Sequence, residues 1–256
     1  KVLGHGGFGK VQLVRYKKDG KIYAMKSIRK NHIIQEDLLQ HTLTERQALL
    51  SLSHPFILSA KYTFQTVDKV FYVSEFIPGG ELRTRITVDP NFSIDRIRFY
   101  GAMLVSAIGF LHEKGIIHRD IKPQNILIDQ DGYLRLIDLG LIKNGMLSNS
   151  TTSTFCGTSE YMAPEMIECA MGYNKDVDWW SLGIILYEMA FRVKPFLKLN
   201  KNELFQSILN DPVEFPPDIE IDKDLKDLIE SLLQKLPEER IGAGIKDAAE
   251  IEEHPF

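Results

Sequence analysis

The spacing of hydrophobic residues changes character about a third of the way along the chain. Before Phe76, short apolar runs follow the pattern of β-strands, and one stretch has helix-spaced apolar positions instead. After the sequence PGGEL at residues 78–82, most of the apolar spacing is helical, and Pro, Gly and Asn separate the helices. The expected strands include residues 11–16, 22–28 and 71–77, and the expected helices are residues 38–52, 97–115, 176–191 and 225–236.

This pattern predicts an α+β fold with two lobes. We expect residues 1–76 to form a small β-rich lobe with one helix, residues 77–81 to form a hinge, and residues 82–256 to form a larger, mainly helical lobe. A chain of 256 residues is long enough to bury a core of this kind. No internal repeat or low-complexity tract interrupts it.

Composition and charge exclude several classes of partner. The chain is 44% hydrophobic and 26% charged, which is ordinary for a globular protein. Its net charge of −4 gives no global attraction for nucleic acid or an anionic membrane, and no run approaches the roughly 18 apolar residues that a membrane span needs. Cys156 and Cys169 fit neither a zinc spacing nor a disulfide framework, so we expect a reducing compartment, the cytoplasm or also the nucleus.

The first chemical candidate is the glycine-rich stretch LGHGGFGKV at residues 3–11. Its GxGxxG pattern occurs in dinucleotide-binding folds, in phosphate-covering loops and in plain tight turns. A dinucleotide fingerprint should open a helix, whereas Gly9 leads into an alternating strand. We interpret the stretch as a strand-loop-strand cover for phosphates, because glycines let backbone N–H groups approach phosphate oxygens. An ordinary hairpin is the alternative.

A second candidate is Lys26, which lies inside the apolar strand around AMK. A lysine in such a place most often extends to the edge of the strand and reaches water. A buried ammonium would need an anion, and Glu45 on the following helix can supply it. Such a pair would join strand to helix and hold the lysine on nucleotide phosphates.

The most informative stretch is IIHRDIKPQNILID at residues 116–129, which contains H-R-D-x-x-x-x-N. Asp120 can accept the proton of a hydroxyl, Lys122 can neutralise a transferring phosphoryl group, and Asn125 offers an oxygen to a hard cation. Asp138 follows an apolar strand across a turn at Asp131-Gly132, and a buried carboxylate there needs a cation. We expect that cation to be magnesium, shared with Asn125.

These motifs resemble eukaryotic protein kinases from the glycine loop to the final HPF, and Lys122 with Thr158 is typical of the serine/threonine class. The AGC group is indicated by STTSTFCGTSEYMAPE, VDWWSLGIILYEM and QHTLTER. Within this group, the chain most resembles the serum- and glucocorticoid-regulated kinases, with protein kinase B close behind. This resemblance rests on three stretches, FQTVDKVFYVSEFIPGGEL, NSTTSTFCGT and LLQK.

The resemblance implies a two-lobed kinase fold with an antiparallel sheet in the small lobe, and an enzyme that uses ATP and Mg²⁺. Its catalytic residues would be Lys26, Glu45, Asp120, Lys122, Asn125 and Asp138, with Asn125 and Asp138 as the metal ligands. Nucleotide would bind between the lobes, against Leu3, Gly4, His5, Gly6, Gly7, Phe8, Gly9, Val11, Ala24, Lys26, Ser74, Glu75, Ile77 and Leu127.

Regulation and internal support are implied in the same way. Thr154 matches an activating phosphorylation site, whose phosphate would be received by His41, Arg119 and Lys143. An upstream kinase resembling phosphoinositide-dependent kinase would add it. Three further residues match supporting positions: Glu165 with Arg240 as an ion pair, and Asp178 as a prop for the catalytic loop.

Substrate recognition is implied by acidic residues that family members turn toward arginines before the phosphoacceptor. The matching acids are Glu81, Glu160 and Glu188, with Thr158 also near the substrate, whereas Gln124 stands where the family usually carries Glu. We therefore expect basic Ser/Thr-containing substrates, with firm selection of Arg three residues upstream of the acceptor and weaker selection at a second arginine site.

Other features qualify this interpretation. Leu139 replaces the usual Phe after Asp138, and Ala60 is smaller than usual in the regulatory stack, which suggests looser regulation. Because the chain starts without Met and inside a functional loop, we interpret it as an excised, monomeric domain that lacks the C-terminal tail of AGC kinases.

Two rival classes remain. A pseudokinase scaffold would bind nucleotide and partners without turnover, but it should lack one of the catalytic residues, and none is missing. A nucleotide-binding oxidoreductase would need a helix after the glycine loop and parallel-sheet alternation, and the chain has neither.

Overall fold

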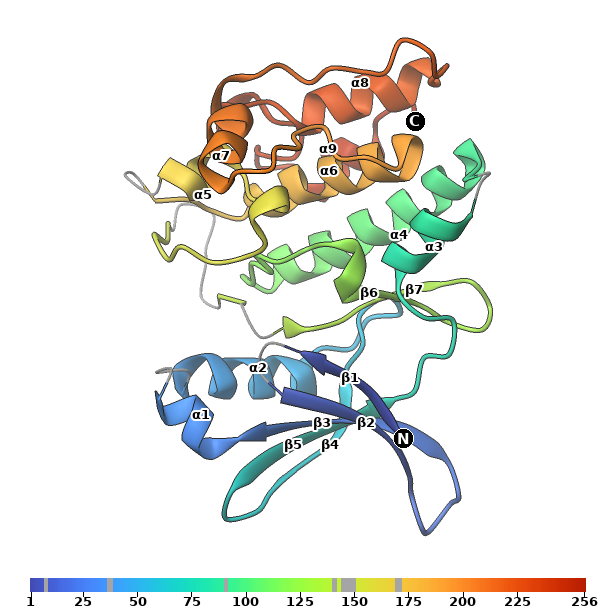
Figure 1. The fold of residues 1–256 in the computed structure, drawn as a ribbon, viewed down its shortest axis with the longest axis vertical. Helices are drawn as coiled ribbons and strands as arrows, with labels where there is room; N and C mark the ends of the chain where they lie inside the picture. Colours follow the sequence, from blue (N-terminus) through green and yellow to red (C-terminus); the bar gives the residue numbers. More distant parts are fainter. Residues whose placement is uncertain (7–8, 36–38, 90–91, 140–141, 144–150, 169–171) are drawn as a thin grey trace.

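The computed structural model describes residues 1–256 apart from 7–8, 36–38, 90–91, 140–141, 144–150 and 169–171. It has two parts, a lower one built on a sheet and an upper one built of helices (Figure 1). This arrangement confirms the predicted α+β, two-lobed fold.

The sheet of the smaller part has five strands in the order β1-β2-β3-β5-β4, and all its neighbours are antiparallel. Its strands are β1 Val2–Gly6, β2 Gly9–Arg15, β3 Ile22–Arg29, β4 Ala60–Gln65 and β5 Lys69–Glu75. Two helices, α1 Lys30–Gln35 and α2 Leu39–Ser51, follow β3. Both lie against one side of this sheet (Figure 1).

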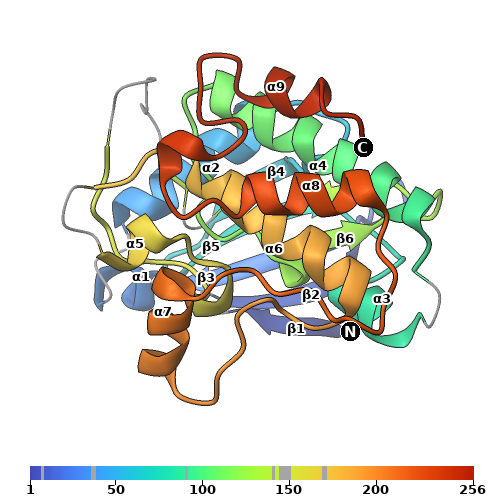
Figure 2. The same cartoon turned by 90° about the horizontal axis from the view of Figure 1, so that it is seen from above.

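The larger part is organised around one buried helix. The helices here are α3 Leu82–Val88, α4 Ile94–Glu113, α5 Pro164–Glu168, α6 Val177–Phe191, α7 Lys201–Asn210, α8 Lys223–Leu232 and α9 Ala248–Glu252. Short 3₁₀ turns occupy Pro123–Asn125 (η1), Ser159–Tyr161 (η3) and Pro237–Glu239 (η4). Nearly every residue of α6 is buried, since α4 and α8 pack against it and other segments cover the rest (Figure 2).

A small hairpin connects the two parts. β6 Ile126–Ile128 and β7 Leu134–Leu136 pair antiparallel around Gly132, whose positive φ of 88° suits a glycine turn. The N–H of Gly79 donates to the carbonyl of Ile128 at 2.9 Å, and the N–H of Ile128 donates to Gly80 at 2.9 Å. The segment that follows the sheet is therefore fixed to the hairpin, which lies between the sheet and the helices (Figure 1).

The predicted elements are present, and the structure adds several that were not predicted. The strands expected at 11–16, 22–28 and 71–77 correspond to β2, β3 and β5, and the four expected helices correspond to α2, α4, α6 and α8. Strand β4 and the helices α1, α3, α5, α7 and α9 were not predicted. Strand β4 lies at an edge of the sheet with mostly exposed residues, and α1 has only six residues, so neither carries a clear hydrophobic period. Within the described residues, no helix is both long and apolar enough to span a bilayer.

Close packing between α6 and α8 generates a stability prediction at Gly183. A Cβ at this position would lie 2.8 Å from Cδ2 of Leu233 and 2.9 Å from Cβ of Leu232. Alanine normally favours a helix over glycine by about 1 kcal/mol, but overpacking a tight core costs about 1–3 kcal/mol. We expect Gly183→Ala to lower the free energy of unfolding, measured by urea denaturation. Gly244→Ala, where the nearest atom would be 3.9 Å away, is the control that should not lower it.

Candidate active site

Lys26 on β3 is held by two carboxylates. Its Nζ lies 2.8 Å from Oε1 of Glu45 on α2 and 2.8 Å from Oδ1 of Asp138, which follows β7. The lysine side chain is only 20% exposed, so it does not extend into water as the alternative interpretation required. Burial by itself would lower the pKa of Lys26, but the two carboxylates outweigh it and raise the pKa above its ordinary value. The predicted strand-to-helix ion pair is confirmed.

Asp138 has a partner that the sequence reasoning did not name. The structure places the Lys26 ammonium on its Oδ1, and magnesium as a further cation at this carboxylate stays a prediction. Burial alone would raise the pKa of Asp138, while Lys26 holds it below the usual value. Its φ of 61° is left-handed, an uncommon conformation for a residue other than glycine. That conformation is maintained by a strong, partly buried ion pair.

The HRD loop brings Asp120, Lys122 and Thr158 into mutual contact. The hydroxyl of Thr158 donates to Oδ1 of Asp120 at 2.7 Å. The ammonium of Lys122 contacts Oδ2 of Asp120 at 2.7 Å and the Thr158 hydroxyl at 2.6 Å. One oxygen of Asp120, Oδ1, therefore accepts a hydroxyl while a cation lies on the other oxygen, Oδ2.

Asn125 is oriented by the same loop. Its amide nitrogen donates to the carbonyl of Asp120 at 2.9 Å and to Oδ2 of Asp120 at 3.0 Å. Since both bonds use Nδ2, the amide oxygen faces away from Asp120.

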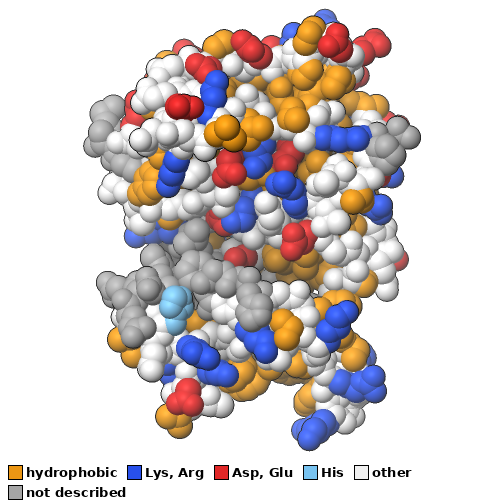
Figure 3. Space-filling view, viewed as in Figure 1, with side chains coloured by type: hydrophobic (Ala, Val, Ile, Leu, Met, Phe, Trp, Pro, Cys, Tyr) orange, Lys and Arg blue, Asp and Glu red, His pale blue; other side chains and the backbone are white. Residues whose placement is uncertain are grey.

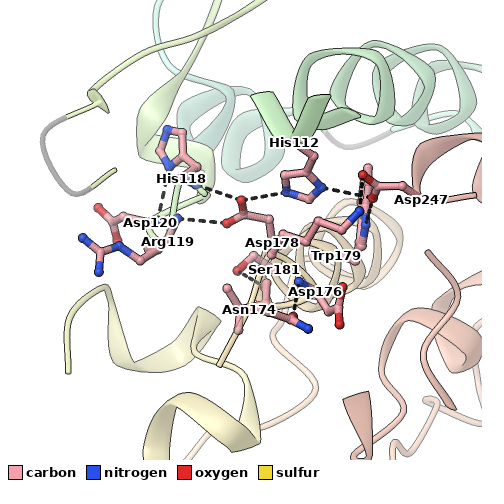
Figure 4. A network of polar contacts seen from close by, with 12 residues as sticks. His112, His118, Arg119, Asp120, Asn174, Asp176, Asp178, Trp179, Ser181 and Asp247 are labelled. Carbon is pink, nitrogen blue, oxygen red and sulfur yellow. Dashed lines mark hydrogen bonds and ion pairs between the residues drawn. The ribbon is translucent and has the colours of Figure 1, made fainter. Parts of the chain in front are cut away.

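A network behind the loop fixes its backbone (Figure 4). Both oxygens of Asp178 on α6 accept backbone N–H groups, from His118 at 2.8 Å and from Arg119 at 2.9 Å. Arg119 has a φ of 67°, so the carboxylate holds a left-handed turn immediately before Asp120. This contact confirms the predicted supporting position of Asp178.

The network continues through His112 to the last part of the chain. The ring of His112 contacts Asp178 through Nε2 at 3.1 Å and Asp247 through Nδ1 at 3.1 Å. Burial alone would lower the pKa of His112, but the two carboxylates raise it. The indole of Trp179 and the ammonium of Lys175 complete the cluster on Asp247, at 2.8 Å and 2.6 Å.

Asn125 and Asp138 fit a magnesium ion by their chemistry. Lys26 occupies Oδ1 of Asp138, which leaves Oδ2, and the orientation of Asn125 leaves its amide oxygen. Magnesium binds oxygen atoms and usually uses one or two carboxylates together with substrate phosphates and water. Among the described residues, no group of three or more His, Cys, Asp or Glu side chains could hold a metal by itself.

The predicted nucleotide-binding residues lie on adjacent elements of the sheet and hairpin. Leu3, Gly4, His5 and Gly6 are on β1, Gly9 and Val11 on β2, Ala24 and Lys26 on β3, Ser74 and Glu75 on β5, and Leu127 on β6. The register pairs Val11 with Lys26 and Ala24 with Ser74, so these side chains come from neighbouring strands. Ile77 is buried just beyond β5. Gly7, Phe8 and the side chain of His5 lie outside the described residues.

The segment around Thr154 makes a contact that sequence reasoning missed. Thr154 is exposed, and its backbone carbonyl accepts the hydroxyl of Tyr173 at 2.6 Å. The buried guanidinium of Arg119 donates to the same hydroxyl at 3.4 Å. Tyr173 thus connects Arg119 to the Thr154 backbone. Lys143 is exposed and its backbone pairs with Ile117, while the side chain of His41 lies outside the described residues.

The predicted substrate acids differ in their surroundings. Glu81 is exposed just before α3, and the described part of the chain gives its side chain no ion-pair partner. Glu160 lies 3.2 Å from Nζ of Lys194, and buried Glu188 accepts the hydroxyl of Tyr161 at 2.6 Å. Gln124 has a buried amide oxygen that lacks a hydrogen-bond partner among the described residues.

Two predicted structural features can also be located. The ion pair between Glu165 and Arg240 is confirmed, with two bonds of 2.7 and 3.0 Å. Leu139 is buried in the same hydrophobic cluster as Ala48 of α2 and Leu52, which follows α2. Ala60 is buried at the start of β4.

Comparisons with known proteins agree with this geometry. A family model described as "Protein kinase domain" matches residues 1–256. The chain is 46% identical to a RAC serine/threonine-protein kinase of Drosophila melanogaster over 256 residues, which are 100% of this chain and 41% of the relative. It is 44% identical to RAC-beta kinases of Xenopus laevis and Homo sapiens, again over all of this chain and 52% and 53% of those proteins. The chain thus spans about half the length of these relatives, and its predicted AGC resemblance is confirmed.

Asp176, beside the network, generates a prediction about pH. It is 3% exposed, its Oδ1 lacks a hydrogen-bond partner among the described residues, and burial raises its pKa from 3.8 to about 6. The folded state therefore retains a proton that the unfolded chain has lost, and stability falls as pH rises from 3.8 to about 6. A shift of this size corresponds to about 3 kcal/mol.

We expect Asp176→Asn to raise the free energy of unfolding at pH 7.5, with the difference from the wild type disappearing near pH 4. Urea denaturation across this pH range measures it, and the exposed Asp218→Asn is the control that should follow the wild type. An equal effect of Asp176→Asn at both pH values would contradict the assignment.

Proposed function

This chain belongs to the protein kinase domain family, and we propose that it transfers the γ-phosphoryl group of ATP to serine and threonine hydroxyls of proteins. The observation that carries the proposal is the contact of the Thr158 hydroxyl with Asp120 and Lys122. This arrangement presents a hydroxyl to a carboxylate base beside a cation, as the attacking group of a phosphoryl transfer requires.

Each side chain has a defined role in this proposal. Asp120 accepts the proton of the substrate hydroxyl, and Lys122 stabilises the negative charge on the phosphoryl oxygens. Lys26, held by Glu45, positions the nucleotide phosphates. Asn125 and Asp138 would hold Mg²⁺, which neutralises charge on the phosphates when bound.

Nucleotide would bind between β1, β2, β3 and the hairpin β6–β7. Gly9 holds β2 close to β3 there, because a Cβ at this residue would lie 2.3 Å from the carbonyl oxygen of Ser27. Ser74, Glu75 and Ile77 would face the adenine from the segment that joins the two parts.

Protein substrates would be basic peptides, read first by Glu81. An exposed carboxylate without an internal partner can attract an arginine of the substrate. Phosphorylation of Thr154 by an upstream kinase would increase activity, because Thr154 is exposed and its backbone is tied through Tyr173 to Arg119, next to Asp120. We further propose a monomeric enzyme acting in the cytoplasm.

Transfer of phosphate from Mg-ATP to a peptide with Arg three residues before Ser tests the proposal. We expect Asp120→Asn and Asp138→Ala to lower kcat/KM by about 10² or more, since each removes a group needed in the transition state. Asp131→Asn, on the exposed turn of the hairpin, is the matched control and should retain activity. ATP binding without any transfer, even by Thr154-phosphorylated protein, would favour a scaffold instead.

The link between Tyr173 and Thr154 gives a second test. We expect phosphorylation of Thr154 to raise kcat/KM, and Tyr173→Phe to reduce that increase several-fold, because it removes a hydroxyl worth about 1 kcal/mol in hydrogen bonding. The same peptide assay, run with phosphorylated and unphosphorylated protein, measures both effects. Tyr16→Phe, which changes an exposed tyrosine just after β2, is the control, and an equal increase in all three proteins would contradict the prediction.

A further inference from the structure

Two of the acids that could read a basic substrate already have cations of this chain as partners. Nζ of Lys194 lies 3.2 Å from Oε1 of Glu160 and 5.0 Å from the ring centroid of Tyr161. The Tyr161 hydroxyl donates to Oε2 of Glu188, and NH1 of Arg83 lies 3.6 Å from Oε1 of Glu188. We call these residues the Tyr161 cluster: Arg83, Glu160, Tyr161, Glu188 and Lys194.

The Tyr161 cluster lies next to the catalytic loop. Glu160 is two residues beyond Thr158, whose hydroxyl contacts Asp120. Burial would raise the pKa of Glu160, while its own backbone N–H, Lys194 and Lys122 lower it. A peptide whose acceptor hydroxyl reaches Asp120 therefore passes near Glu160 and the groups that neutralise it.

Lys194 is held in place rather than free to move aside. It follows the end of α6, where Arg192 adopts a left-handed φ of 60°. Phe191 before it and Phe196 after it are both buried, and Phe196 stacks on Trp180 with ring centroids 5.8 Å apart. The lysine side chain is 12% exposed, so its ammonium depends on Glu160 and on the Tyr161 ring for compensation.

The ion pair between Lys194 and Glu160 changes which substrate side chains the Tyr161 cluster can attract. An arginine of a substrate would have to displace Lys194 from Glu160 and leave a poorly solvated ammonium without its partner, so it gains little. Acidic and basic side chains are interspersed over the middle of the helical part on the face shown in Figure 3, rather than acidic ones alone. In contrast, Glu81 is exposed and Gln124 offers only an uncharged oxygen.

We propose that Lys194, assisted by Arg83, determines substrate specificity by neutralising Glu160 and Glu188, so that the enzyme selects peptides with one arginine and takes neutral or acidic residues at the Tyr161 cluster. This inference rests on the proposed kinase function. The single arginine is read by Glu81, and an acidic side chain of the substrate can accept hydrogen bonds from Lys194 directly.

Binding of fluorescent peptides in which Ala replaces the acceptor tests the inference without requiring turnover. One series keeps Arg three residues before the acceptor and places a second Arg, Ala or Glu at each other position in turn. We expect wild-type protein to show no preference for a second Arg over Ala. At the positions that face the Tyr161 cluster, Lys194→Met should bind the Arg peptide about fivefold or more tighter than the Ala peptide, and lose any preference for Glu.

Controls separate charge from packing. Lys194→Arg keeps the charge and should retain wild-type selectivity, and Lys198→Ala removes a lysine of the same loop that is 45% exposed and should also retain it. Unchanged selectivity in Lys194→Met, wild-type preference for a second Arg at the cluster, or no peptide binding at all would each overturn the inference. The phosphate-transfer assay with Mg-ATP is scored separately, so selective binding without transfer would count against the proposed function and still support the role of Lys194.

Discussion

The ion pairs of the Lys26 ammonium connect the two parts of this molecule, and the geometry of the site depends on them. It is contributed by the sheet, Glu45 comes from a helix, and Asp138 comes from the segment after the hairpin, so three elements far apart in sequence meet at one charge. An ammonium removed from water is costly without partners, and two carboxylates next to each other are costly without a cation. Each group is therefore acceptable only because the others are present. Rotation of α2 away from the sheet would leave an incomplete set, which couples the position of that helix to the geometry of the site.

A second constraint acts from the opposite side. Both oxygens of Asp178 accept backbone N–H groups, and the second of these belongs to Arg119. Arg119 has a left-handed backbone conformation and immediately precedes Asp120. The buried helix α6 supplies a rigid base for this carboxylate, and His112 with Asp247 fixes its orientation. The cost of the unusual backbone at Arg119 is thus met by bonds that approach from behind the loop.

Much of this arrangement could be predicted because its signals are local. Strands β2, β3 and β5 contain short apolar runs, the long helices contain extended apolar stretches, and the residues from His118 to Asn125 match a known loop pattern. The pair of Lys26 and Glu45 could be inferred because a buried lysine requires an anion and the next helix offers one. Three contacts could not be predicted: Lys26 with Asp138, Tyr173 with the Thr154 backbone, and Lys194 with Glu160. They join segments that are distant in sequence, and such contacts produce no periodic pattern of apolar residues. Each of them involves a long side chain whose local sequence would equally suit a solvated surface.

The unequal cores of the two parts have a consequence for local unfolding. In the described residues, the sheet part has a separate buried cluster of only Ile28, Ile33 and Tyr72, whereas the helical part shares one extensive core around Trp179 and Trp180. Segments with little buried apolar contact open at lower free energy than the molecule as a whole. The backbone amides of the sheet should therefore exchange their hydrogens through partial opening, while those of α6 exchange only when the whole chain unfolds. A ligand bound against the sheet would be linked to that partial equilibrium, so its binding energy would protect the smaller part first.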